Sequence, residues 1–167
     1  MLKGALLLVV LLACTAVGRS LSGARRRRAE SLNELLAAMR VLRLRMLNSM
    51  EPLGILLRKS DCHLFRLLGN DLRTGSNLYD CWRERCESES RRGGALDSLS
   101  TDDVILLNGF FKHLGGSGRE EQNELFSGVI TEMEMAQTHA RRSYADASKI
   151  YTALGTLVGI GLCVLIV

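Results

Sequence analysis

Three cysteines and one histidine are the residues of this 167-residue chain best suited to chemistry. Cys62 and His63 are adjacent, and four residues separate Cys81 from Cys86. Thiolates and imidazoles are the ligands that zinc prefers, so the four could form one site if the fold joined them. The spacing matches no known zinc knuckle, and neighbours on a helix point in different directions. The pattern favours structural thiols, with zinc at these cysteines as an alternative.

No other arrangement is typical of an enzyme. His113 and His139 lack a Ser or carboxylate partner in a recognisable constellation. The glycine-rich run 115–118 lacks the lysine and the spacing of a phosphate-binding loop. The paired acids at 102–103 and 120–121 are better explained as charges at helix starts than as acid–base pairs. The sequence therefore predicts a protein that is not an enzyme and needs no metal or cofactor.

Composition indicates helices and argues against a nucleic-acid-binding module. Apolar residues make up 47% of the chain, aromatic residues 5%, and there is one proline. Leu, Ala and Arg dominate, which favours helix over sheet. Residues 19–149 carry 21 Lys and Arg against 18 Asp and Glu. A balance this even predicts no nucleic-acid surface unless the basic residues form a localised patch.

The first apolar segment, residues 4–18, leaves three interpretations open: a membrane anchor, a cleaved signal peptide and a lipoprotein signal. As a helix it spans about 22 Å, and snorkelling of Lys3 and Arg19 can extend it. The lipoprotein interpretation rests on Leu11-Leu12-Ala13-Cys14, which resembles a lipobox. Four arginines follow the segment: Arg25, Arg26, Arg27 and Arg28. Because the positive-inside rule keeps such a cluster in the cytoplasm, an uncleaved anchor is expected.

The second apolar segment, residues 150–167, gives the same topology. Arg141, Arg142 and Lys149 precede it, and no charge follows it. Residues 19–149 are therefore expected to form a cytoplasmic domain, with both termini on the far side of the membrane. Gly155 and Gly159 form a small-residue ridge that either packs a helix in lipid or reflects the frequency of glycine in spans.

Between the two anchors the pattern predicts an all-α fold, a small bundle of about six helices. Leucine and methionine repeat at three-and-four spacing on the first of them, at Leu32, Leu35, Leu36, Met39, Leu42 and Met46. Ser31 and Glu34 could begin this helix as a capping box, or the helix could run on from the first anchor. Arg40, Arg43 and Arg45 lie on its opposite face, where solvent or anionic lipid is expected.

The middle of the chain predicts three shorter helices. Pro52 ends the first helix or begins the next, since proline fits only the first turn. The stretch Gly69-Asn70-Asp71 is expected to end a helix over 62–68, and Ser76 to cap one that holds Trp82. Residues 88–100 form the expected exposed loop.

The last third of the chain organises the rest. Thr101 is expected to cap a helix that runs to Leu114, with Asp102 and Asp103 supplying negative charge at its start. Gly115 and Gly116 allow a left-handed turn. Ser117 and Glu120 then predict a capping box. Because residues 118–167 contain no proline, one helix could run from this turn into the second apolar segment.

These features resemble the stage III sporulation protein AB family of endospore-forming bacteria over nearly the full length. The most specific match is the run 114–122, Leu-Gly-Gly-Ser-Gly-Arg-Glu-Glu-Gln, which is similar to the family pattern Leu-Gly-x-Ser-Asp-Arg-x-x-Gln. Pro52 in Met50-Glu51-Pro52-Leu53 and Trp82 in Tyr79-x-x-Trp82 resemble two further, weaker motifs. Gly118 departs from the family Asp, which removes a charge from the start of the last helix.

The resemblance implies a function that the helical pattern does not show. Family members belong to a secretion-like membrane assembly that joins the mother cell to the forespore, and their soluble domain resembles that of type II secretion and type IV pilus platform proteins. It implies a scaffold subunit in the mother-cell membrane whose partners are the assembly's ATPase and its other membrane subunits. The contact candidates are Arg40, Arg43, Pro52, Trp82, Ser117, Arg119 and Gln122. The competing hypothesis is an exported helical binding protein anchored through Cys14, with a disulfide among Cys62, Cys81 and Cys86.

Overall fold

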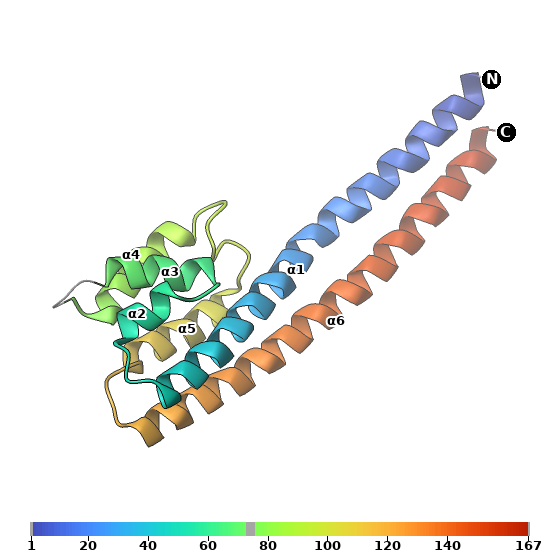
Figure 1. The fold of residues 1–167 in the computed structure, drawn as a ribbon. Coiled ribbons are helices and arrows are strands. Elements are labelled where there is room, and N and C mark those ends of the chain that lie inside the picture. Colours follow the sequence, from blue (N-terminus) through green and yellow to red (C-terminus); the bar gives the residue numbers. More distant parts are fainter. Residues whose placement is uncertain (1, 73–75, 167) are drawn as a thin grey trace. The chain divides into compact units, whose positions relative to one another are not determined.

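The computed structural model describes the backbone of residues 2–72 and 76–166, and the side chains of residues 23–72, 76–146, 149 and 153. Six helices and no strands form this part of the chain, which confirms the all-α prediction and the helix number. They are α1 (Leu2–Asn48), α2 (Leu53–Arg58), α3 (His63–Asp71), α4 (Leu78–Glu89), α5 (Thr101–His113) and α6 (Arg119–Ile166) (Figure 1).

The helices group into two compact units. A central unit comprises residues 30–138, and a terminal unit comprises residues 1–29 and 139–167. Helices α1 and α6 contribute to both, because each continues without a break towards its terminus. The prediction of one long last helix is therefore confirmed. Ser31 does not cap a new helix, since it lies inside α1 with its Oγ 2.8 Å from Ser98 Oγ.

Among the residues described in this way, no helix combines the length and the apolarity that a membrane crossing requires. The two predicted spans, residues 4–18 and 150–167, lie outside the side chains that the structure describes, apart from Ala153. Cys14, Gly155 and Gly159 are among these residues whose side chains are not described, so the predictions made for them stay predictions.

The core of the central unit is built on the predicted leucine stripe of α1. Five of its six residues are at most 4% exposed: Leu32, Leu35, Leu36, Met39 and Leu42. Met46 is half-buried. Phe110 and Phe111 of α5 are also buried, and the ring centroid of Phe126 of α6 lies 5.1 Å from that of Phe110. The spacing of apolar residues thus identified the core face of α1 correctly.

The third helix ends at the last residue of the predicted stretch, three residues later than expected. The stretch Gly69-Asn70-Asp71 lies inside α3, which ends at Asp71. Gly69 is buried, and a Cβ atom at this position would lie 2.5 Å from the backbone N of Arg58 in α2. The glycine therefore lets two helices approach closely instead of ending one of them.

Two helix caps fall one residue from their predicted positions. Asn77, not Ser76, caps α4, because its side chain accepts a hydrogen bond from the Tyr79 N–H (2.9 Å). Ser100, not Thr101, caps α5 in a complete capping box with Asp103. The acids in the first turn of α5 are confirmed. Neighbouring polar residues have similar capping propensity, so sequence alone does not select between them.

Candidate partner-docking site

Two turns meet at one end of the central unit, and together with the first residues of α6 they carry four of the seven predicted contact residues. The first turn, residues 49–52, joins α1 to α2, and the second, residues 114–118, joins α5 to α6 (Figure 1). They touch through Leu53, whose Cδ2 lies 3.1 Å from the position that a Cβ atom of Gly115 would take. We call residues 49–53 and 114–122 the turn end.

Gly115 makes the second turn possible. Its φ of 79° is in the left-handed region, where a side chain would be strained, and it follows Leu114, the residue that caps the end of α5. The predicted left-handed end of this helix is confirmed at Gly115. The helix end is closed further by the Leu114 N–H, which donates to the Phe110 carbonyl (3.0 Å).

Gln122 holds the second turn from inside. Only 4% of the residue is exposed. Its Oε1 accepts from the Gly115 N–H (3.0 Å), and its Nε2 donates to the His113 carbonyl (3.0 Å) and to Ser117 Oγ (2.7 Å). One amide side chain on α6 therefore satisfies backbone groups that the end of α5 leaves unpaired. Gln122 supports the surface from below, whereas Ser117 and Arg119 are exposed on it.

The predicted capping box of Ser117 and Glu120 was wrong. Helix α6 begins at Arg119, so Gly118 takes the cap position, and Ser117 bonds to Gln122 instead. Glu121 lies three residues after Gly118, and its Oε2 accepts from the Gly118 N–H (3.3 Å). Half of a capping box thus exists one residue later than predicted. The other half is missing because glycine has no side chain to accept from the helix.

Replacing Gln122 by Ala is expected to lower the free energy of unfolding by about 1–2 kcal/mol, because three hydrogen bonds at the turn are lost together. Gln122→Glu should cost a similar amount, since a carboxylate accepts from Gly115 but cannot donate to the His113 carbonyl. Urea titration of the full chain in detergent measures both. Asn123→Asp is a poor control because Asn123 bonds to Arg43, so Glu124→Gln, at an exposed residue, serves instead and should change little. Equal stability of all four proteins would contradict the role given to Gln122.

The first turn presents an apolar tip. Pro52 directly precedes α2, and its carbonyl accepts from the Ile55 and Leu56 N–H groups (2.9 and 3.2 Å). The prediction that Pro52 begins the second helix is therefore confirmed. Glu51 pairs with Lys59 across the turn, at 2.7 Å between Oε1 and Nζ. Met50 beside it is 99% exposed. Met50 could not be selected from the sequence, because a single apolar residue in a turn gives no periodic pattern.

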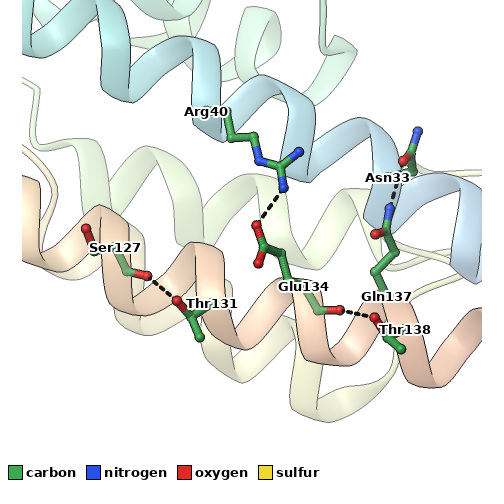
Figure 2. Close-up of polar contacts among 7 residues, drawn as sticks. All are labelled: Asn33, Arg40, Ser127, Thr131, Glu134, Gln137 and Thr138. Atoms are coloured by element: carbon green, nitrogen blue, oxygen red, sulfur yellow. Dashed lines mark hydrogen bonds and ion pairs between the residues drawn. The ribbon is translucent and has the colours of Figure 1, made fainter.

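Arg40 and Arg43 are not part of the turn end, and both contact α6. Arg40 forms an ion pair with Glu134, and Arg43 donates twice to Asn123 Oδ1 (2.8 and 3.0 Å). Gln137 Nε2 donates to Asn33 Oδ1 (2.7 Å) further along the same helices. Figure 2 shows the Arg40 and Gln137 contacts between α1 and α6. Because residue numbers rise on α1 as they fall on α6, the two helices are antiparallel here.

Trp82 lies in the core. It is 0% exposed, stacks on Phe111 with 4.4 Å between ring centroids, and donates from Nε1 to Asn108 Oδ1 (3.1 Å). Its indole therefore shapes the central unit from within and presents no atoms to a partner in this structure.

The three described cysteines are free thiols. Burial raises the pKa of the Cys62 thiol, and desolvation followed by the charge of Asp71 raises the pKa of Cys81. Both thiols therefore stay protonated near neutral pH, unlike the thiolates that bind metals. Cys81 lines a polar hollow together with Asp80 and Glu84. In the same hollow Asp71 forms an ion pair with Arg85, and this hydrogen-bonded carboxylate raises the pKa of Arg85. Within the described residues, no three His, Cys, Asp or Glu side chains are arranged to hold a metal ion.

Comparison with known protein families shows which family the chain belongs to. The model of the stage III sporulation protein AB family matches residues 3–167. The chain belongs to this family. Membership implies involvement in stage III of sporulation. The comparisons with curated proteins and with solved structures found no match.

Proposed function

We propose that the chain is a non-enzymatic platform subunit of the secretion-like complex that joins the mother cell to the forespore. In this proposal, residues 4–18 and 150–167 anchor it in the mother-cell membrane. The central unit lies in the cytoplasm, both termini lie on the far side, and the assembly's ATPase and other membrane subunits are the partners. The family match over residues 3–167 supports the sporulation context, and the turn end supports the docking role.

One observation carries the docking role. Pro52, Ser117 and Arg119 are exposed at the turn end although more than 60 residues separate the first from the others in sequence. Met50 adds a fully exposed apolar side chain, and apolar and arginine side chains are frequent energetic anchors of interfaces. Gln122, Gly115 and the Glu51–Lys59 pair hold this surface in one conformation before a partner arrives. A preorganised exposed surface with no chemistry of its own fits a scaffold better than an enzyme.

The docking role is tested with full-length chain in detergent and the purified ATPase. Met50→Asp and Arg119→Glu should each weaken binding, about 30-fold for a residue at the centre of the interface. Two controls make the same chemical changes elsewhere on the central unit: Ile105→Asp, at a residue 62% exposed on α5, and Arg83→Glu, at an exposed residue of α4. Full binding by the turn-end variants, or equal loss in the controls, would reject the turn end as the docking surface.

The topology is tested by cysteine labelling in intact cells. A variant with Cys62, Cys81, Cys86 and Cys163 changed to Ser keeps Cys14, the anchor of the alternative, and receives one new cysteine at the exposed Arg92. The same variant without the new cysteine gives the background labelling. A membrane-impermeant maleimide should label the new cysteine only after lysis. Labelling of intact cells would place the central unit outside the cell and favour the alternative, a protein anchored through Cys14. That alternative also expects a disulfide, whereas the three described cysteines are free thiols.

A further inference from the structure

The two units carry opposite net charge. Residues 1–29 and 139–167 hold nine Lys and Arg against one acid, Asp146, whereas residues 30–138 hold 13 Lys and Arg against 17 Asp and Glu. The overall charge of +4 is thus the sum of +8 on the terminal unit and −4 on the central unit. The even balance over residues 19–149 hid this division, because that range cuts across both units.

Six arginines of the terminal unit gather at one level of its two helices. Ala29 of α1 and Ala140 of α6 are 9% and 3% exposed, a burial that small residues reach where two helices meet. Counting outwards from these alanines along antiparallel helices brings residues 25–28 level with 141–144. The arginines at this level form what we call the collar: Arg25, Arg26, Arg27, Arg28, Arg141 and Arg142.

The collar surrounds the helices instead of forming a stripe on one side. Four consecutive residues of a helix point in directions about 100° apart, so Arg25 to Arg28 cover the circumference of α1. Five of the six collar residues are exposed, and Arg28 is half-buried. The collar therefore places six positive charges at one level of the two helices. An external anionic surface that reaches all sides of the helices would attract such a belt of charge.

The distance to the apolar segments identifies that surface. Arg26 is eight residues from the end of the segment 4–18, and Arg142 is eight residues from the start of the segment 150–167. At about 1.5 Å per residue, both lie about 12 Å outside the expected hydrocarbon edge. A headgroup layer of about 5–8 Å and the length of an arginine side chain cover this distance. We propose that the collar binds the anionic headgroups of a phospholipid bilayer, an inference that rests on the membrane spans of the proposed function.

Lipid retention by the full chain tests the collar. The chain is extracted in a neutral detergent, mixed with phosphatidylglycerol or phosphatidylcholine, and examined by native mass spectrometry. Several phosphatidylglycerol molecules should stay bound, and phosphatidylcholine should be lost. Changing Arg25, Arg26, Arg27 and Arg28 together to Gln should reduce retention about tenfold or more. The matched control changes four exposed arginines of the central unit to Gln, namely Arg66, Arg83, Arg91 and Arg92, and should keep the lipid.

Three results would overturn the inference. The first is equal retention of the two lipids by the unaltered chain. The second is equal loss from the collar variant and the control. The third is displacement of phosphatidylglycerol by millimolar inorganic phosphate or by duplex DNA, which would make the ligand a soluble anion or a nucleic acid. Alkaline carbonate extraction of the chain from vesicles tests the spans separately: release of the protein rejects the anchors, whatever the lipid charge.

Discussion

Replacing Trp82 by Ala is expected to lower the free energy of unfolding of the central unit by about 3–5 kcal/mol. The indole is fully buried, and it stacks on Phe111 at 4.4 Å with 25° between the ring planes. Phe111 in turn meets Phe65 of α3 and Phe110 of α5 edge to face, at 5.8 and 5.2 Å. Removing the indole would leave a cavity among α3, α4 and α5. Because a domain is stable by only about 5–15 kcal/mol, this single change can remove most of its stability.

A second variant separates the packing of Trp82 from its hydrogen bond. Trp82→Phe keeps an aromatic ring but leaves Asn108 without the indole N–H, and should cost less than Trp82→Ala. Urea titration of the full chain in detergent, followed by circular dichroism, measures both. Trp82→Ala should weaken binding of the ATPase only as far as it unfolds the central unit. Trp82→Phe, which is more stable, should bind the ATPase again. Loss of binding in a Trp82→Ala protein of unaltered stability would instead assign the indole a direct contact.

The sequence could predict most helices because their apolar spacing and polar ends are local properties. The six helices, the stripe on α1 and the left-handed Gly115 all follow from patterns within about ten residues. Cap positions failed by one residue, at Ser76, Thr101 and Ser117, because adjacent polar residues compete and the winner depends on the geometry of the chain before the helix.

The candidate site could be predicted only in part, because it depends on long-range contacts. Pro52 and Ser117 were selected through a family resemblance, and only the fold brings their two turns together. Gln122 was selected as a surface contact, yet it is buried under the turn, where it makes three hydrogen bonds. Arg40 and Arg43 were expected to face solvent or lipid. Both instead join α1 to α6. Their partners, Glu134 and Asn123, lie more than 75 residues away in the sequence, so a local pattern could not reveal them.

Gly69 shows how a long-range contact reverses the meaning of a residue. Glycine followed by Asn and Asp is typical of a helix end, and the local pattern gave no reason to think otherwise. Helix α2 lies against α3 at this position. Because glycine has no Cβ atom, the backbone of Arg58 can approach α3 closely there. A buried glycine inside a helix therefore reports the approach of another helix, which sequence alone cannot locate.

Gly69→Ala is consequently expected to destabilise the central unit by about 2–3 kcal/mol, although alanine is the better helix former. The new Cβ atom would lie 2.5 Å from Arg58 N and 3.0 Å from the Leu57 carbonyl carbon, so α2 must move away from α3. Gly109 provides the matched control: it lies inside α5, it is exposed, and no atom lies within 4 Å of its added Cβ. Gly109→Ala should therefore stabilise by about 0.5–1 kcal/mol through helix propensity and chain entropy. The two substitutions are chemically identical, so opposite signs in urea titration isolate the contact between α2 and α3. Stabilisation by both would show that α2 does not pack against Gly69 in solution.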